Sequence, residues 1–372
     1  MSIYDIRTEE KIKKSEIVVY DGHSVYCEGR MTHTSPLWHS VGLPQLLERR
    51  DLPDEMIRAA FQDLTTGSFG EVEATAFLLA LRFKGEASTE IATAVGVLRE
   101  AMIRLQPTTR PVLDTCGTGG DGSGTFNIST ATALVVAGTG TPIVKHGNRS
   151  VSSRSGSADV LAVLGVPIES GPAWAERSLA KVGLAFCFAP HFHPAMAKVA
   201  PLRRKLGVRT IFNLLGPLLN PAGAEYQLLG VSRPELLDSM AGAIARLGVR
   251  QAFLVCGRDG LDEVSLSAPT LVRRVLAGKV ESLEWLPRDF GLEEVHLTDL
   301  TADGPEASAA IVQDILNGND SPARRIVLAN AAAALLAVEH VSSLPEGVQL
   351  AARAIDSGAA QRVLEGLTRS PA

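Results

Sequence analysis

Between residues 88 and 105, apolar side chains follow one another at spacings of 4, 3, 4 and 3, which places them on one face of a helix. They are Ile91, Val95, Leu98, Met102 and Leu105. Two similar stretches come before it, one beginning at Pro53 and one over Glu71–Phe83, and Ser88 is placed to cap the third helix. The pattern predicts a small all-helical unit over residues 38–105.

From residue 111 onward, short apolar runs alternate with helical stretches. This alternation predicts an α/β domain with a mostly parallel central sheet. Ligands of such sheets bind beyond the carboxyl ends of the strands, and here polar motifs directly follow the apolar runs. The candidate strands are Val112-Leu113, Ile143-Val144, Leu184–Ala189, Leu228–Val231 and Ala252–Cys256.

Residues 1–37 differ from both regions. Ile17–Tyr20 and His23–Cys27 are β-prone runs on either side of Asp21-Gly22. This pair suits a type I′ turn, because both turn residues take a positive φ. A lone hairpin is marginally stable in water, so we expect this β-hairpin to be a structural extension that packs on the rest of the protein.

The composition excludes several classes of protein. With 45 % hydrophobic and 21 % charged residues among 372, the chain is expected to fold rather than to stay disordered. A net charge of −5 argues against non-specific nucleic-acid binding, and the longest apolar run, about residues 331–338, is too short to span a membrane. The four cysteines are scattered and no signal peptide is evident, so we expect a reduced, cytoplasmic protein.

A glycine-rich segment follows the first candidate strand. Five of the eight residues from Gly117 to Gly124 are glycine, which lets the backbone approach a ligand and turn its N–H groups toward it. Asn127, Ser129 and Thr130 then stand at the start of an apolar helix, whose N-terminus favours anions. The segment predicts a phosphate site. It contains a G-x-G-x-x-G spacing, but the acidic residue that accompanies this spacing in dinucleotide-binding folds does not follow.

Cations and histidines follow later candidate strands. Lys145 offers a point charge and Arg149 a planar fork, and both groups suit phosphate. His191 and His193 have no third ligand nearby, so we expect them to line an apolar pocket rather than to hold zinc. Arg203 lies in a short basic run, where a solvated face and a contact with a substrate carboxylate are equally good interpretations.

Asp262 and Glu263 are adjacent carboxylates that follow the last candidate strand. Such a pair suits Mg²⁺, which is usually held by one or two carboxylates together with substrate phosphates. No serine, cysteine or lysine has the base partner that covalent catalysis requires. Together these features predict a site that uses Mg²⁺, binds a highly phosphorylated substrate and stabilises a departing pyrophosphate.

Six motifs stand in order within about residues 40–365. They are Gly117-Thr118-Gly119-Gly120-Asp121, Asn127-Ile128-Ser129-Thr130, Lys145-His146-Gly147-Asn148-Arg149, Ser155-Gly156-Ser157-Ala158-Asp159, Phe212-Asn213-Leu214-Leu215-Gly216-Pro217 and Asp259–Glu263. This combination closely resembles the anthranilate phosphoribosyltransferase family. The resemblance implies transfer of the phosphoribosyl group of 5-phosphoribosyl 1-pyrophosphate (PRPP) to anthranilate, which gives N-(5-phosphoribosyl)anthranilate and pyrophosphate in tryptophan biosynthesis.

The same resemblance implies a domain organisation and an assembly. A helical domain over 38–105 would be completed by about residues 203–223. An α/β domain would comprise 106–202 and 224–372, and the 1–37 extension lies outside the usual pattern of the family. The protein would be a homodimer that binds neither nucleic acid nor membranes.

Site residues follow from the resemblance, motif by motif. His146 is a candidate for proton transfer. Mg²⁺ is expected on Ser129, Asp262 and Glu263. Anthranilate is expected to contact Gly117, Asn148, His193 and Arg203, with Arg203 facing its carboxylate. PRPP is expected to contact Gly117, Gly119, Gly120, Asp121, Thr125, Asn127, Ile128, Ser129, Thr130, Lys145, Arg149, Ser153 and Ser157.

Two departures and three alternatives keep the function open. Arg154 stands where the family usually has lysine and Leu219 where it commonly has threonine, so the acceptor could differ. A related phosphoribosyltransferase with another acceptor is therefore one alternative. A pyrimidine nucleoside phosphorylase would need a phosphate site without the Asp262-Glu263 pair. A non-catalytic nucleic-acid-binding paralogue would be expected to lose the PRPP residues and to gain a basic face.

Overall fold

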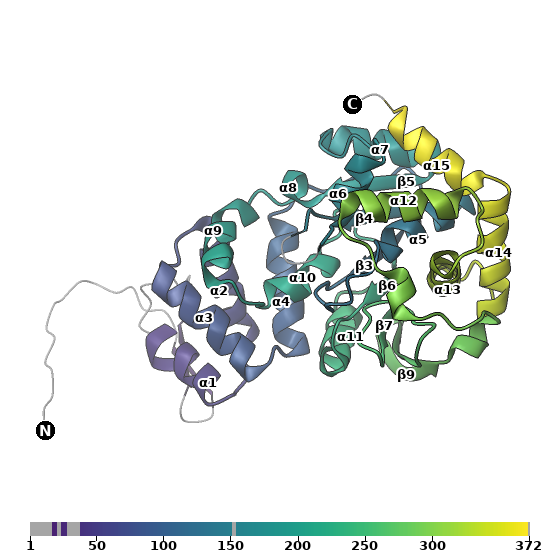
Figure 1. Cartoon of the computed structure of the whole chain (residues 1–372). Coiled ribbons are helices and arrows are strands. Elements are labelled where there is room, and N and C mark those ends of the chain that lie inside the picture. Colours follow the sequence, from purple (N-terminus) through teal and green to yellow (C-terminus); the bar gives the residue numbers. More distant parts are fainter. Residues whose placement is uncertain (1–16, 21–23, 28–37, 151–153, 371–372) are drawn as a thin grey trace, which may run out of the picture.

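The computed structural model describes residues 17–20, 24–27, 38–150 and 154–370 (Figure 1). Near the N-terminus, β1 (Ile17–Tyr20) pairs antiparallel with β2 (Ser24–Cys27), as the predicted hairpin requires. The Asp21-Gly22 turn lies outside the described residues. In the part of the chain that the structure describes, no helix has the length and apolar character needed to cross a membrane.

A bundle of helices follows (Figure 1). A π-helical turn (Trp38–Gly42) leads into α1 (Leu43–Leu47), α2 (Asp54–Thr66), α3 (Glu71–Lys84) and α4 (Ser88–Glu100). Two later helices, α9 (Met196–Leu206) and α10 (Phe212–Leu215), return to this bundle. There α9 packs on α2 and α3, and α10 packs on α4.

Two helix starts differ by one residue from the sequence prediction. Pro53 is the N-cap of α2 rather than its first helical residue, and Ala87 rather than Ser88 is the N-cap of α4. At α4 the expected serine cap is replaced by Glu90, whose carboxylate accepts a hydrogen bond from the Ala87 N–H at 2.9 Å. A carboxylate in the first turn also suits the positive end of the helix dipole.

The α/β domain is built on a seven-stranded, mostly parallel sheet in the order β5-β4-β3-β6-β7-β8-β9. The parallel strands are β3 (Leu113–Gly117), β4 (Ile143–Gly147), β5 (Leu184–Phe188), β6 (Tyr226–Gly230) and β7 (Gln251–Gly257). They confirm the five candidate strands. The antiparallel strands β8 (Thr270–Leu276) and β9 (Lys279–Trp285) were not predicted.

Helices cover both faces of this sheet (Figure 1). One face packs against a cluster of helices that includes the alanine-rich α13, while α11 covers the other face and also contacts α4 of the bundle. The core of the helical bundle is therefore continuous with the core on the α11 face of the sheet. The helices of the α/β domain are α5 (Ile128–Gly138), α6 (Ser157–Val163), α7 (Gly171–Val182), α8 (Ala189–Phe192), α11 (Leu237–Arg246), α12 (Pro305–Leu316), α13 (Pro322–Ala337), α14 (Leu344–Asp356) and α15 (Ala359–Thr368). Short 3₁₀ turns span Gly216–Leu218, Pro234–Leu236, Pro287–Phe290 and Leu297–Leu300.

Candidate active site

The predicted motifs meet at the carboxyl edge of the parallel strands. From β3 the chain moves outward to β4 and β5, and then returns to β6 on the other side of β3. The strand order thus reverses at β3, which is the position where open α/β sheets bind ligands. The glycine loop after β3, Lys145 and His146 on β4, and the 259–263 turn after β7 all lie at this edge.

The glycine loop has a backbone that requires glycine. Gly119, Gly120, Gly122 and Gly124 have φ values of 61°, 74°, 77° and 67°, in the left-handed region that other residues rarely adopt. The Gly119 N–H donates a hydrogen bond to Asp262 Oδ2 at 2.9 Å. The loop after β3 is therefore fixed directly to the carboxylate turn after β7.

Arg209 also holds this loop and was not predicted. Its Nη2 donates to the carbonyl of Thr118 at 3.0 Å. A Cβ on Gly120 would lie 1.6 Å from Arg209 Nη1, so a larger residue there would have to displace the guanidinium. The sequence offers no local signal for this contact, because the arginine lies 91 residues from Thr118.

Asp262 and Glu263 lie together with Asp121 at the end of the loop. The Asp262 N–H is 3.4 Å from Asp121 Oδ2. Burial and the neighbouring Asp121 raise the pKa of Asp262 to about 7, and burial together with Asp262 raises the pKa of Glu263 well above its usual range. The carboxylates would thus be relieved of mutual repulsion by a bound cation.

The donors present fit Mg²⁺. A backbone hydrogen bond from Ser129 reaches Glu263, which brings the start of α5 to the carboxylates. Within the described residues, no three His, Cys, Asp or Glu side chains form a metal-binding group by themselves. The two carboxylates and the Ser129 hydroxyl are hard oxygen donors, and a Mg²⁺ site of this kind is completed by substrate phosphates and water.

Lys145 lies at the centre of a buried polar network. Its ammonium donates to the Thr115 carbonyl and, at 3.1 Å, to Ser129 Oγ. Burial raises the pKa of Asp114 to about 6, against the opposing effect of Lys145, and burial lowers the pKa of Lys145. Asn220 donates to Asp114 Oδ2 at 2.7 Å and to the Val144 carbonyl at 2.7 Å. Asp114 and Asn220, which were not predicted, therefore fix the end of β4 that carries Lys145.

The structure brings His146 and His193 together. Their Nε2 atoms are 3.1 Å apart, and His146 Nδ1 is 3.1 Å from the Gly216 carbonyl. Burial is the main cause that lowers the pKa of His146 to about 3 and that of His193 to about 4. Both rings are therefore neutral at physiological pH and line the space between β4 and the 216–219 segment.

Asn127 belongs to a hydrogen-bond network at the start of α5. Its Oδ1 accepts hydrogen bonds from the hydroxyls of Ser155 and Ser308, each at 2.9 Å. Ser308, from α12, was not predicted. Ile128 and Thr130 beside Asn127 are buried, and Thr125 Oγ1 lies 3.2 Å from the Ser123 hydroxyl within the loop.

Ser157 begins α6 beside the end of β4. A Cβ on Gly147 would lie 2.2 Å from Ser157 Oγ, so the serine packs directly against that glycine. Asn148 is exposed, and its Oδ1 accepts a hydrogen bond from the Arg149 N–H at 2.8 Å.

Arg149 and Arg203 differ in their partners. Arg149 forms ion pairs with Asp159 at 3.2 Å and Glu169 at 2.8 Å, so a PRPP phosphate would have to compete with two carboxylates. Arg203 lies 5.3 Å from the ring centre of Phe212, and desolvation lowers its pKa. The described residues provide no ion pair to Arg203, which leaves its guanidinium available to a carboxylate.

Three further positions were singled out in the sequence. Ser153 lies outside the described residues, so its contact with PRPP stays a prediction. Arg154 forms an ion pair with Asp303, and Leu219 is buried with its carbonyl as a hydrogen-bond partner of His193.

Gly230, where β6 ends, is expected to be indispensable. A Cβ there would lie 1.6 Å from the backbone oxygen of Asp262, and backbone cannot move aside cheaply. Gly230→Ala should therefore lower the free energy of unfolding by about 3 kcal/mol and reduce turnover by displacing Asp262. Urea unfolding measures the first effect.

Gly96→Ala is the matched control for this substitution. Gly96 lies in α4 with no atom within 4 Å of the new Cβ. An alanine there should raise stability by about 0.5–1 kcal/mol, because it favours the helix. Wild-type stability in Gly230→Ala would contradict the close approach of the two segments.

Two family models and several known proteins are similar to this chain in sequence. Residues 109–361 match the glycosyl transferase family, a/b domain, and residues 43–102 match the glycosyl transferase family, helical bundle domain. The anthranilate phosphoribosyltransferase of Symbiobacterium thermophilum is 48 % identical over 323 residues, which is 87 % of this chain and 95 % of the relative.

Solved structures of anthranilate phosphoribosyltransferases are also similar to this chain. The crystal structure of anthranilate phosphoribosyltransferase from Thermus thermophilus has a TM-score of 0.81 at 42 % identity, over 88 % of this chain and 98 % of that one. The Saccharomyces cerevisiae enzyme in complex with PRPP and Mg also has a TM-score of 0.81, at 30 % identity over 91 % and 99 % of the two chains.

Proposed function

Because the chain belongs to the anthranilate phosphoribosyltransferase family, we propose that it transfers the phosphoribosyl group of PRPP to anthranilate in tryptophan biosynthesis. The observation that carries this proposal is the meeting of the glycine loop, Lys145 and the Asp262-Glu263 carboxylates at the point where the strand order reverses. Phosphate donors and a cation site lie side by side there, as a pyrophosphate leaving group requires.

The proposed ligand contacts follow the motifs. We infer that Ser129, Asp262 and Glu263 hold Mg²⁺ and that Gly117, Asn148, His193 and Arg203 contact anthranilate. PRPP would be held by residues of the glycine loop, the start of α5 and the end of β4. These are Gly117, Gly119, Gly120, Asp121, Thr125, Asn127, Ile128, Ser129, Thr130, Lys145, Arg149, Ser153 and Ser157.

In the proposed mechanism, binding and electrostatics do most of the work. The N–H groups of the glycine loop and the Lys145 ammonium hold the pyrophosphate oxygens as negative charge develops on them. When bound, Mg²⁺ supplies further positive charge to the same leaving group. Anthranilate, held near Asn148 and Arg203, attacks C1′ directly with its neutral amine, so no covalent enzyme intermediate forms.

The neutral His146 ring could take up the proton that the amine loses. Burial keeps its pKa near 3, so the ring is neutral before the reaction, and Nε2, which faces His193, is the nitrogen that would accept the proton and pass it on. Because an aromatic amine is already neutral at pH 7, this step contributes less than the positioning of the two substrates.

The direct test is the loss of anthranilate fluorescence when protein, PRPP and Mg²⁺ are mixed, with each omitted in turn. Loss that needs all three components supports the transfer reaction. If PRPP binds by calorimetry but fluorescence stays constant, the acceptor is another amine, and Arg154 and Leu219 are the first positions to examine. If PRPP does not bind, the proposal fails.

The proposed domain organisation uses the same boundaries as the sequence-based expectation. A helical domain over 38–105 and 203–223 would close over an α/β domain of 106–202 and 224–372, with 1–37 as an extension. The three described cysteines, Cys116, Cys187 and Cys256, are free and buried, which supports a reduced, cytoplasmic environment.

We further propose a homodimer. Exposed apolar side chains gather on α1, α3 and the segment after α9, and contiguous patches of this kind mark interaction surfaces. Leu47, Val72, Leu79, Phe83 and Val208 expose 66, 79, 41, 71 and 54 % of their surface. Sedimentation equilibrium should give twice the mass of one chain, and a monomer at all concentrations would contradict this assembly.

Arg203→Ala is expected to change the KM for anthranilate much more than the KM for PRPP. Loss of the guanidinium should raise the KM for anthranilate by roughly tenfold or more, because a charge-assisted hydrogen bond to its carboxylate disappears. The KM for PRPP should change little. Steady-state kinetics with each substrate varied in turn measures both constants.

Arg204→Ala is the matched control, since Arg204 is the exposed neighbour on α9. It should leave both constants near their wild-type values. An equal rise of both KM values in Arg203→Ala would show that Arg203 serves the phosphates or the fold instead.

A further inference from the structure

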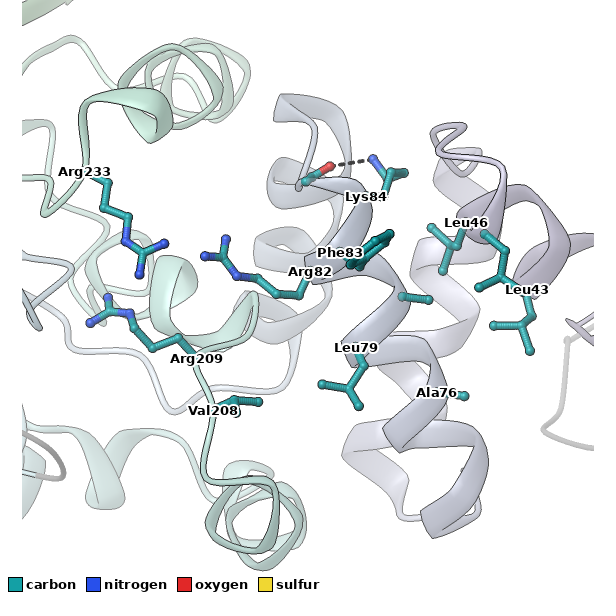
Figure 2. Close-up of a pocket in the computed structure, with 13 residues that line it drawn as sticks. Leu43, Leu46, Ala76, Leu79, Arg82, Phe83, Lys84, Val208, Arg209 and Arg233 are labelled. Carbon is teal, nitrogen blue, oxygen red and sulfur yellow. Dashed lines mark hydrogen bonds between the residues drawn. The ribbon is translucent and has the colours of Figure 1, made fainter.

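An open cleft of about 1070 Å³ lies on the helical bundle and reaches Arg233 of the α/β domain (Figure 2). Its walls come from α1, α3, the segment after α9 and the loop after β6. Figure 2 shows Arg82, Arg209 and Arg233 converging at one end, whereas Leu43 and Leu46 lie at the other. The cleft therefore has a cationic end and an apolar end. The apolar side chains Leu47, Leu79 and Phe83 also belong to the proposed dimer surface, so the free ligand site is confined to the cationic end.

The positive charge of the three guanidinium groups is only partly neutralised. Burial lowers the pKa of Arg209, and the nearby charges of Arg233 and Arg82 lower it further, so Arg209 lies within electrostatic reach of both cations. Arg233 has no ion pair among the described residues. The Asp121 and Asp262 carboxylates partly offset the charge of Arg209 from the side of the glycine loop.

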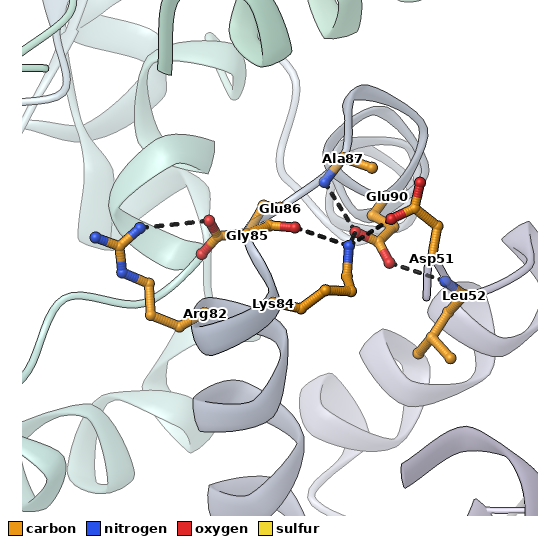
Figure 3. A network of polar contacts seen from close by, with 8 residues as sticks. All are labelled: Asp51, Leu52, Arg82, Lys84, Gly85, Glu86, Ala87 and Glu90. Carbon is orange, nitrogen blue, oxygen red and sulfur yellow. Dashed lines mark hydrogen bonds and ion pairs between the residues drawn. The ribbon is translucent and has the colours of Figure 1, made fainter. Parts of the chain in front are cut away.

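The charged groups in α3 and in the turn after it form ion pairs (Figure 3). Lys84 also lines the cleft, but its ammonium is engaged by Asp51 at 2.6 Å and Glu90 at 2.8 Å. Glu86 is buried and forms an ion pair with Arg82 at 3.5 Å, so it offsets part of the positive charge of Arg82. Desolvation is the main cause that raises the pKa of Glu86, and the neighbouring Arg82 opposes this shift.

We propose that Arg82, Arg209 and Arg233 form a second oxyanion site, which binds a phosphate-type group at the cationic end of the cleft. Three converging guanidinium forks match the several oxygens of such a group, and binding would relieve their mutual repulsion. The ligand is either inorganic phosphate or the pyrophosphate that the proposed reaction releases. In the second case the inference rests on the proposed function.

Arg209 links this site to catalysis. The same guanidinium donates to the Thr118 carbonyl and covers Gly120 in the glycine loop. An oxyanion in the cleft competes with the loop for Arg209, so it alters the loop that holds the leaving group. Arg209 is thus a positioning residue for the loop as well as a ligand of the second site.

The test is calorimetric titration of the full-length protein with inorganic phosphate and, separately, with pyrophosphate, at constant ionic strength and without Mg²⁺. Arg82→Gln with Arg233→Gln should weaken the binding of at least one probe by about tenfold or more, because two charged donors are lost. The single variant Arg233→Glu, at an exposed residue, should weaken it further. The matched control is Arg258→Gln with Arg288→Gln, two exposed arginines elsewhere, which should bind as wild type does.

The possible outcomes distinguish inorganic phosphate from pyrophosphate as the ligand, and they distinguish failure of the second site from failure of the proposed function. If the cleft variants lose affinity for inorganic phosphate but not for pyrophosphate, the free phosphate ion is the ligand. A selective loss of pyrophosphate binding identifies the product, and the double variant should then show weaker product inhibition at an unchanged KM for PRPP. Wild-type affinity for both probes in the two cleft variants would overturn the second site. None of these binding measurements needs turnover, so they stand even if the transferase proposal fails.

Discussion

Asp262→Asn combined with Glu263→Gln should reduce turnover by roughly a thousandfold and leave the protein at least as stable as the wild type. The two effects have one cause. Both carboxylates have raised pKa values, because each is buried and each lies near other acidic groups. The folded chain without a cation is therefore under electrostatic repulsion, which neutral amides remove along with the proposed Mg²⁺ ligands.

The measurement combines turnover as a function of Mg²⁺ concentration with thermal unfolding in chelator. The Gly119 N–H can still donate to the amide oxygen at position 262, so the loop contact survives the substitution. Asp299→Asn with Glu294→Gln, at two exposed acidic positions, is the matched control and should keep full activity. Undiminished Mg²⁺-dependent turnover in the double variant would remove Asp262 and Glu263 from the metal site.

Local sequence was sufficient to single out those parts of the candidate site that lie within one loop or at one strand end. The glycine loop, the polar start of α5 and Lys145 at the end of β4 each carry their signal within a few residues, because glycine density and strand-end polarity are local properties. Their meeting at one edge follows from the parallel sheet, so it could be predicted from the alternating pattern.

The parts that could not be predicted depend on contacts between distant segments. Arg209 and Asn220 reach the site across 91 and 106 residues, and Ser308 reaches Asn127 across 181. The sequence around a single arginine, asparagine or serine contains no pattern that predicts a contact with such a distant residue. The same limit applies to the core, because the sequence predicts a helical unit but not that α4 packs on α11 of the other domain.

The antiparallel strands β8 and β9 do have a local signal, which is the turn between them. Ala277 and Gly278, which separate them, both have positive φ values of 47° and 78°, as a tight hairpin turn requires. Most of β9 is exposed, and the β8 residues Arg273 and Arg274 interrupt its apolar run. A search for apolar runs alone therefore misses this edge of the sheet, whereas a search for turn residues would find it.

Lys145→Met should abolish turnover and lower the free energy of unfolding by about 3–5 kcal/mol at pH 7.5. Lys145 is the cation that offsets the buried Asp114, and it also lowers the pKa of Glu263. Methionine fills a similar volume without the charge, so the carboxylates remain buried and uncompensated. Lys181→Met, at an exposed lysine of α7, is the control and should be nearly neutral in both assays.

The pH dependence of the stability lost in Lys145→Met distinguishes an effect of the Lys145 charge from an effect of side-chain packing. Burial raises the pKa of Asp114 from 3.8 to about 6 in the folded protein, so its contribution to stability is greatest below pH 4 and is lost as the pH rises through 6. Protonation removes the buried negative charge that Lys145 balances. The stability difference between wild type and Lys145→Met should therefore shrink as the pH falls from 7.5 to 5, measured by urea unfolding at each pH. A difference that stays constant over this range would mean that Lys145 acts through packing rather than through its charge.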